Sequence, residues 1–132
     1  MTRELPFIGT LKVSAEETSG SLEVIEGRGP TSPPPHVHRH RDEFFYVLEG
    51  RLHFTLGTDN FDLQQGDTVF VPRGTRHGFK PEGSAHYLLV IAPAGLEGFF
   101  TELGNGLAAG RSSDEIRAAL AHKYDSSPAD EV

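Results

Sequence analysis

Strand-like patterning dominates the middle of the chain, where aromatic and β-branched residues are frequent and apolar side chains alternate with polar ones. Such a pattern predicts half-buried β-strands. Turn-forming residues interrupt the segment 43–79 at Gly50, 57–60, 66–67 and 72–74. Turns at this spacing predict an antiparallel meander of short strands.

Two further strands are expected on either side of the meander. The segment 19–27, which lies between glycines, reads as one strand, and 86–93 is apolar at successive positions, as in a strand covered on both faces. The proline-rich segment 27–35 predicts an extended loop, because a residue before proline is driven away from helical geometry.

The period changes to that of a helix after Pro93. Apolar residues then recur at helical spacing in a first stripe made of Leu96, Phe99, Phe100 and Leu103. Ser112 and Glu115 have the spacing of a capping box. They precede a second stripe made of Ile116, Ala119, Leu120 and Tyr124. Two short helices are therefore predicted at the C-terminal end.

These patterns predict an all-β protein with a helical appendage. The expected parts are a β domain over 1–93, a helical tail over 94–125 that packs on it, and a disordered end over 126–132. A chain of 132 residues corresponds to one domain and can bury a core without disulfides or structural metals.

Composition narrows the classes of function. The chain has no cysteine, which excludes disulfides, thiolate metal sites and cysteine nucleophiles. Its net charge of -7 argues against nucleic acid as the partner, because phosphate binding requires a basic face. The N-terminal residues contain no long apolar stretch, so we expect no signal peptide and no membrane span, and a cytoplasmic location.

Alternation along the strand that begins at Glu43 separates two faces. It directs Glu43, Phe45 and Val47 inward and the residues between them outward. The outward set is expected to be too apolar to stay exposed, so a second sheet, the helical tail or a partner subunit must cover it. This set comprises Phe44, Tyr46, Leu48, Tyr87, Leu89 and Ile91.

Histidines and a carboxylate cluster at predicted strand ends. His36 and His38 are two positions apart and can therefore point to the same face of a strand. Glu43 opens the next strand, and His77 stands at the head of another. Three imidazoles and one carboxylate suit a divalent Fe, Mn, Ni, Zn or Cu ion. Taken alone, His36 and His38 are equally consistent with a polar surface, and Glu43 alone is more typical of a surface carboxylate at a strand start.

The four other histidines are not expected to belong to the metal site. His40 lies between two arginines, His53 and His86 lie within apolar strands, and His122 lies in the helical tail. We expect each of them to be exposed or to be hydrogen-bonded within the fold, and none to bind metal.

The spacing of the candidate ligands resembles the two motifs of the cupin superfamily. The first is His36-x-His38-x4-Glu43-x6-Gly50, and the second is Gly66-x5-Pro72-x-Gly74-x2-His77. The chain further resembles the single-domain bacterial cupins grouped with flavonol dioxygenases (quercetinases), including the helical tail after the sequence APAG at 92–95.

This resemblance implies a fold, a metal and an assembly. The fold would be a double-stranded β-helix, a small jelly-roll barrel. One divalent transition metal ion per chain would be held by His36, His38, Glu43 and His77, and Glu43 would also accept the proton of a small-molecule substrate. A homodimer would be the common assembly.

Three functions remain open from the sequence. They are a metal-dependent dioxygenase acting on a phenolic or enolisable molecule, a non-oxidative cyclase, isomerase or decarboxylase, and a small-molecule binding protein without turnover. Phe99, Phe100 and Leu103 could close the barrel as a lid or simply pack on the sheet. The candidate pocket walls, which could equally be ordinary core, are Phe45, Val47, Phe54, Phe70 and Phe79.

Overall fold

The computed structural model describes residues 3–6, 8–29 and 32–128. The helices are α1 (Glu97–Ala108) and α2 (Ser113–Leu120). The strands are β1 (Arg3–Leu5), β2 (Gly9–Val13), β3 (Glu23–Arg28), β4 (His36–Val37), β5 (Asp42–Leu56), β6 (Asp59–Gln64), β7 (Thr68–Val71), β8 (His77–Ala92) and β9 (Ser127–Pro128). Strands form across the predicted region 43–79, but they do not make a meander, because β6 and β7 each pair with β5 and not with each other. The strand expected over 19–27 begins later, at Glu23, because turns occupy the residues before it.

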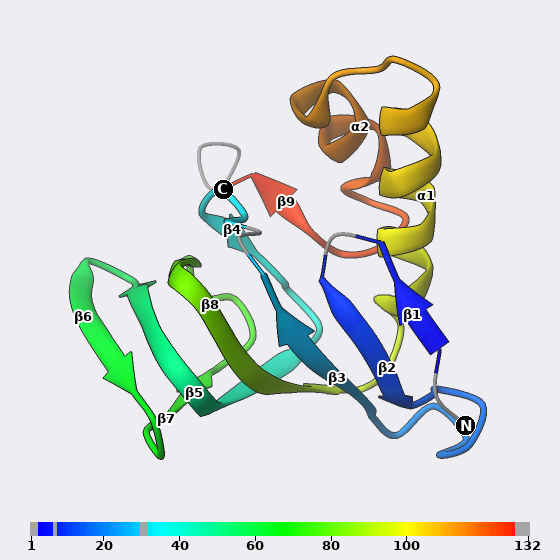
Figure 1. Ribbon diagram of the computed structural model, residues 1–132. Coiled ribbons are helices and arrows are strands. Elements are labelled where there is room, and N and C mark those ends of the chain that lie inside the picture. The colour runs from blue at the N-terminus through cyan, green and yellow to red at the C-terminus, as the bar shows by residue number, and fades with distance from the viewer. Residues whose placement is uncertain (1–2, 7, 30–31, 129–132) are drawn as a thin grey trace.

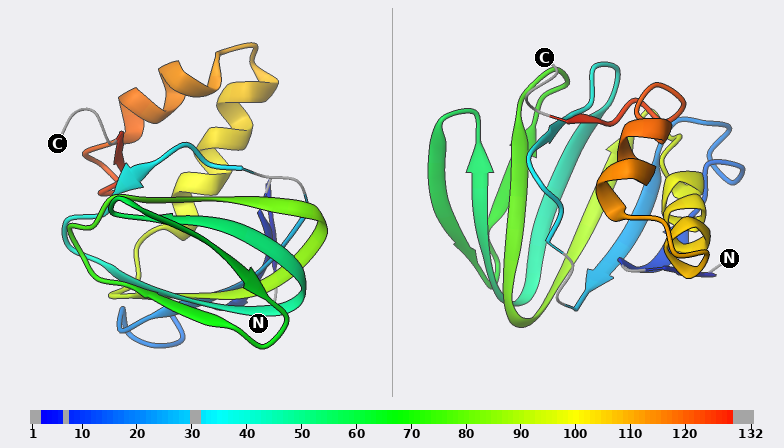
Figure 2. Two further views of the ribbon diagram at one scale, coloured as in Figure 1. Left: turned by 90° about the vertical axis from the view of Figure 1, so that its left-hand side faces the viewer. Right: turned by 90° about the horizontal axis from the view of Figure 1, so that it is seen from above.

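Two long strands organise the sheets. β5 and β8 pair antiparallel, from Asp42 opposite Ala92 to Leu56 opposite His77. The register shifts on both sides of Glu49, next to Gly50, which has a positive φ and no room for a Cβ against Ala85. On its other edge β5 pairs with β7 before this bend and with β6 after it. The strands thus curve around a common interior (Figures 1 and 2).

The interior is filled by side chains from the inward faces of β5 and β8. The rings of Phe45, Phe54, Phe79 and Tyr87 contact one another, mostly edge to face. All four are at most 6% exposed. Aromatic contacts of this kind add to the free energy gained by burying the ring surface. The alternation predicted for Glu43, Phe45 and Val47 is confirmed, since these residues are buried.

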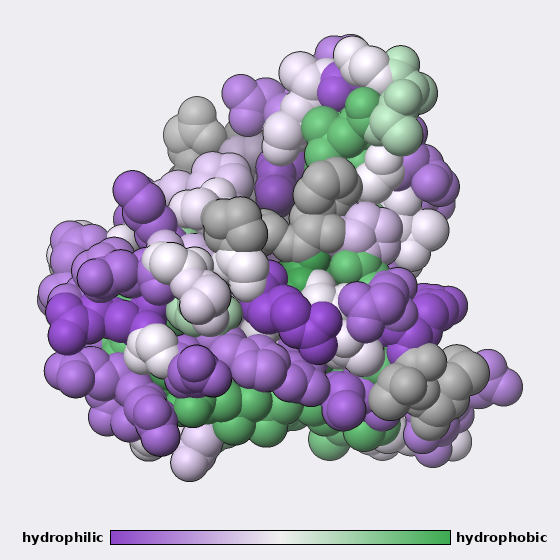
Figure 3. Space-filling model, in the orientation of Figure 1, coloured by the Kyte–Doolittle hydropathy of each residue, from purple (hydrophilic) through white to green (hydrophobic). Residues whose placement is uncertain are grey.

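The predicted outward face was only partly right. Tyr87, Leu89 and Ile91 are buried in the core, because β8 sets them directly opposite the inward residues of β5, and directly opposed residues share a face of the sheet. The apolar residues that do lie outside are Phe44, Tyr46 and Phe70, which are 36%, 39% and 54% exposed. A hydrophobic band is visible at the lower side of the molecule (Figure 3).

Both predicted helices form and pack on the barrel (Figure 2). Ser112 is the N-cap of α2, and its hydroxyl accepts a hydrogen bond from the backbone N–H of Glu115. Ile116 is 1% exposed and lies so close to Gly106 of α1 that a Cβ there would meet its methyl group at 2.7 Å. Ala119 is exposed, so this member of the second stripe was wrongly placed.

The chain remains ordered beyond the predicted end of the tail. Ser126 is buried, and β9 pairs with β4, placing Ser127 opposite Val37. Disorder was expected over 126–132, and the structure places 127–128 in a strand at a sheet edge, whereas 129–132 lie outside the described residues. Within the described part of the chain, no helix is long and apolar enough to cross a membrane.

Candidate metal centre

Four side chains from separate segments meet inside the barrel. β4 supplies His36, β8 supplies His77 directly opposite it, and β5 supplies Glu43. His38 follows β4 immediately. One ligand atom from each of the four lies within 4.8 Å of those of the other three. Glu43, His38 and His77 are at most 4% exposed, and His36 is partly buried.

The turn between His38 and Glu43 is clamped by a residue that sequence reasoning missed. The carboxylate of Asp125 accepts hydrogen bonds from the backbone N–H groups of Arg39 and His40, each at 2.8 Å. It also forms an ion pair at 3.1 Å with Arg41. The tail therefore fixes the loop that carries His38 into the site.

Each imidazole is oriented by a backbone carbonyl. The Nδ1 atoms of His36, His38 and His77 lie 2.7, 2.8 and 2.9 Å from the carbonyl oxygens of Pro34, Asp125 and Thr75. A carbonyl oxygen can only accept, so each Nδ1 carries a proton, and Nε2 is the ring nitrogen left to face the site. This is the arrangement in which metal-binding histidines are commonly held.

Two of these Nε2 atoms face the carboxylate of Glu43. Nε2 of His77 lies 2.8 Å from Oε1 of Glu43, and Nε2 of His38 lies 3.4 Å from Oε2 of the same carboxylate. Two acceptors at such a distance require a cation between or upon them, either a proton on the ring or a metal ion. Three nitrogen atoms and one carboxylate oxygen match the preferences of divalent transition metals. The residues present therefore fit a metal of this class.

Burial and mutual charge set the protonation of the cluster. Burial, together with the neighbouring His77 and His38, lowers the pKa of His36 to about 3, so this ring stays neutral. Burial opposes ionisation of Glu43, but His38 and His77 outweigh it and hold the pKa of the carboxyl well below its usual value. Burial would lower the pKa of His38, but Glu43 and Asp125 raise it overall. The site thus holds one anion, Glu43, beside the neutral ring of His36 and the more basic ring of His38.

A small pocket adjoins the cluster and is lined by His36, His38 and Glu43. Its cavity volume is about 50 Å³, which is room for a few water molecules, because one water needs roughly 10–15 Å³ by this measure. Barrel and tail both line it. The remaining lining residues are Ile8, Pro33, Phe45, Phe79, Leu89, Leu96, Phe99, Phe100, Leu103, Arg117 and Ser126.

The pocket walls differ from the predicted set. Phe45 and Phe79 line the pocket as expected, whereas Val47 and Phe54 are buried in the core and do not line it. Phe70 was wrongly predicted, since alternation along β7 turns it to the outside, where it is 54% exposed. Phe99, Phe100 and Leu103 of α1 line the pocket as well. In the sequence, their helical spacing indicated a helix but not a pocket wall.

The remaining histidines lie away from the cluster, as expected. Nδ1 of His53 lies 2.5 Å from a carboxylate oxygen of Asp62, and Nε2 of His86 lies 2.5 Å from Glu26. His40 and His122 are exposed.

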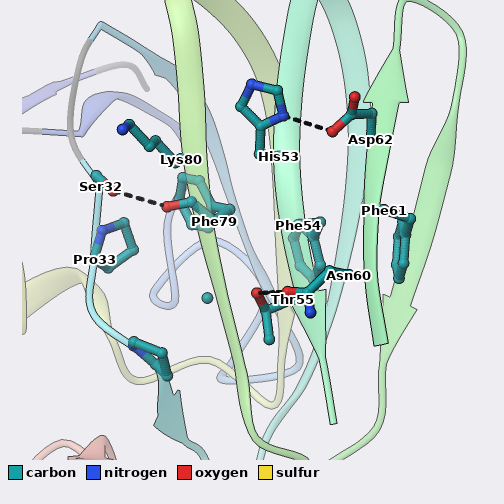
Figure 4. A pocket seen from close by; sticks show the side chains of 12 residues that line it. Ser32, Pro33, His53, Phe54, Thr55, Asn60, Phe61, Asp62, Phe79 and Lys80 are labelled. Carbon is teal, nitrogen blue, oxygen red and sulfur yellow. Dashed lines mark hydrogen bonds and ion pairs between the residues drawn. The ribbon is translucent and has the colours of Figure 1, made fainter. Parts of the chain in front are cut away.

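A second, wider concavity lies between the segment 32–35 and the strands β5, β6 and β8, with a volume of about 560 Å³ (Figure 4). Polar side chains, among them His53, Asp62 and Lys80, surround it. It contains none of the four clustered residues, so its larger volume does not make it the chemical site.

Comparison with known proteins identifies the family. The profile described as "Cupin domain" matches residues 21–91. The chain is a cupin. A solved protein with a double-stranded β-helix domain from Klebsiella pneumoniae has a TM-score of 0.56 and 19% identity, covering 67% of this chain and 77% of that one. It confirms the predicted fold, a double-stranded β-helix. An RmlC-like cupin from Shewanella frigidimarina gives a TM-score of 0.53 at 25% identity, covering 57% of this cupin and 68% of its own chain.

Curated relatives include a dioxygenase and a polyketide synthase protein. Quercetin 2,3-dioxygenase of Bacillus subtilis is 33% identical over 97 residues, which is 68% of this cupin and 28% of the relative. The tetracenomycin polyketide synthase protein TcmJ of Streptomyces glaucescens is 32% identical over 82 residues, covering 61% of this cupin and 55% of the relative. This cupin therefore spans about half or less of the length of these relatives.

Proposed function

We propose that this cupin binds one divalent transition metal ion through His36, His38, Glu43 and His77 and acts as a metal-dependent dioxygenase on a small phenolic or enolisable molecule. The observation that carries the metal is the convergence of three imidazoles and one carboxylate whose ligand atoms all lie within 4.8 Å of one another. The similarity to quercetin 2,3-dioxygenase supports the reaction class.

The bound metal would supply Lewis acidity and access to oxygen chemistry. The chain itself contributes a base, three oriented imidazoles and an apolar pocket wall that excludes water. Glu43 lines the pocket and is ionised, so it can take a proton from a hydroxyl group of the substrate. The rings of Phe45 and Phe79 exclude water on the barrel side and present flat apolar surface to a planar substrate.

Pocket size constrains how a substrate enters. Sites that enclose drug-sized ligands are usually about 300–1,000 Å³, whereas this cavity measures about 50 Å³. A flavonol-sized substrate would require α1 to move outward, because Phe99, Phe100 and Leu103 of α1 form the wall opposite the barrel. A smaller substrate would enter without this movement.

A second candidate uses the same residues without O2. The similarity to a tetracenomycin polyketide synthase protein and to a second Streptomyces protein described as polyketide synthase CurC favours a non-oxidative cyclase, isomerase or decarboxylase. In that case Glu43 would still move the proton, and O2 consumption would be absent.

Assembly as a homodimer is part of the proposal. Phe44 and Phe70 stand directly opposite each other on the outer face, next to Tyr46, and all three are exposed. A second copy covering this face would remove apolar surface from water. Light scattering on Phe70→Lys should then report a monomer where the wild type is a dimer, and a monomeric wild type would contradict the assembly.

The deciding experiment combines metal content and O2 uptake. Untagged protein, analysed by inductively coupled plasma mass spectrometry, is expected to hold about one Fe, Mn, Ni, Zn or Cu ion per chain and to consume O2 with flavonols or simpler phenols. Glu43→Gln should retain metal and lose turnover, whereas the exposed Glu49→Gln on the same strand should retain both. Stoichiometric metal with anaerobic turnover would favour the non-oxidative candidate. Protein without metal after reconstitution would refute both.

A further inference from the structure

Arg117 is a cation within a pocket that is otherwise mostly apolar on the side of the tail. It lies on α2 and lines the same cavity as His36, His38 and Glu43. Its Nε donates a hydrogen bond to the hydroxyl of Ser113 at 3.1 Å, and its guanidinium carbon lies 5.7 Å from the centre of the Phe99 ring. These two contacts hold the planar group in place.

No carboxylate among the described residues lies within ion-pair distance of Arg117. Other arginines of this acidic chain do have such partners, for example Arg41 with Asp125 and Arg73 with Asp42. Burial lowers the pKa of Arg117, although the charge of Asp114 opposes this shift. A partly buried cation with no anion in direct contact is stabilised when a ligand supplies one.

We propose that Arg117 binds a carboxylate of the ligand, so that a phenolic or enolisable molecule that carries a carboxylate binds better than its neutral counterpart. This inference rests on the proposed function in one respect, which is that the ligand bound by Arg117 also reaches the four proposed metal-binding residues. The guanidinium offers parallel N–H groups that match the two oxygen atoms of a carboxylate. The buried Ser126, which lines the same pocket, is a further polar wall residue from the tail.

The two charges divide the recognition of the ligand. In the metal-free protein Glu43 is an anion that would repel a carboxylate from its own vicinity, whereas Arg117 on the helical side attracts one. A ligand with a hydroxyl group at one end and a carboxylate at the other would then enter with its carboxylate toward Arg117. The cavity has room for a few water molecules, so a ligand that contains a ring would require the tail to move outward.

The test compares charged and neutral probes of the same shape. Isothermal titration calorimetry with 4-hydroxybenzoate and 4-hydroxybenzamide, and with benzoate and benzamide, should give at least about tenfold tighter binding of each acid, because a hydrogen-bonded charge pair contributes about 1.5–3 kcal/mol. Arg117→Met should lose this preference, and Arg117→Lys should keep part of it. Arg111→Met, which changes an exposed arginine beyond the pocket, should keep all of it.

Metal-free and metal-loaded protein should both be titrated. If metal-free wild type prefers the acid and Arg117→Met does not, the role of Arg117 is supported even if the protein never binds metal. The carboxylate site at Arg117 and the metal-dependent function can therefore fail separately. Equal binding of acid and amide by the wild type, an unchanged preference in Arg117→Met, or no binding of any of the four probes at millimolar concentration would overturn the assignment. Circular dichroism checks that each variant is folded.

Discussion

The barrel and the C-terminal tail build one pocket from opposite sides, and they do so with different chemistry. The barrel supplies His36, His38, Glu43 and His77 from strands whose pairing fixes their positions. The tail supplies apolar walls, Arg117 and the carbonyl that orients His38. The barrel thus carries the reactive groups, whereas the tail determines their orientation, their exposure to water and the size of what can enter.

Removing a ligand from the barrel should have the largest effect. His77→Ala is expected to abolish stoichiometric metal binding, because it deletes one of four converging donors and leaves the other three short of a full set. Mass spectrometry of the purified protein measures the metal content. His53→Ala, which removes an exposed histidine from the same barrel, is the matched control and should bind metal normally. Full metal content in His77→Ala would refute the assignment.

Opening the tail should come next. Ile116→Ala removes a fully buried side chain that joins α2 to Gly106 of α1, and such a change costs about 2–5 kcal/mol of stability. Hydrogen exchange should show faster exchange in α1 and α2 and little change in β5 and β8. Equal loss of protection in the strands would show that barrel and tail unfold as one unit, which would weaken the distinction between them.

A smaller effect is expected where the tail reaches the metal residues. Asp125→Ala removes the carboxylate that holds the 39–41 turn and places an alanine at a φ of 54°, which alanine adopts poorly. Changes to groups that orient metal ligands typically cost about 10–100-fold in affinity, and we expect the lower end of this range. Asp125→Asn, which tolerates this φ, should bind metal more tightly than Asp125→Ala in a chelator competition. Unchanged affinity in both variants would remove Asp125 from the site.

The smallest effect concerns the junction of the two parts. Glu23 of β3 is fully buried, and its Oε1 accepts hydrogen bonds from the backbone N–H groups of Gly95 and Leu96, just before α1. Burial raises the pKa of its carboxyl above the usual 4.5, although the two backbone hydrogen bonds oppose this, and Glu97 raises it further. The folded protein therefore holds this proton more tightly than the unfolded chain does.

Stability should accordingly fall as the pH rises from about 4.5 through the raised pKa of Glu23. Glu23→Gln keeps an oxygen acceptor for both N–H groups and has no charge, so its free energy of unfolding should depend less on pH over this range. Chemical denaturation of both proteins at a series of pH values measures the difference. Parallel pH curves for the two proteins would contradict this account of the junction.

Residue spacing alone determined much of this protein. Alternation identified the inward face of β5, helical periodicity located both helices, and the spacing of His36, His38, Glu43 and His77 marked the four side chains that meet inside the barrel. These features could be predicted from the sequence because each depends on a local repeat of apolar residues or on a fixed spacing of residues within a motif. The sequence did not show on which face of the sheet Tyr87 and Phe70 lie. The face of Tyr87 depends on which strand pairs with β8, and the face of Phe70 depends on how the short strand β7 is oriented when it pairs with β5.

Only the tertiary structure decided what surrounds the four side chains. Arg117 and Asp125 are more than 70 positions away from Glu43 in the chain, and nothing in their local sequence distinguishes them from surface residues. They reach the site because the two short helices bury their apolar stripes against each other and β9 then pairs with β4. Long-range packing of this kind depends on the shape of both surfaces, which no local pattern of apolar and polar residues encodes.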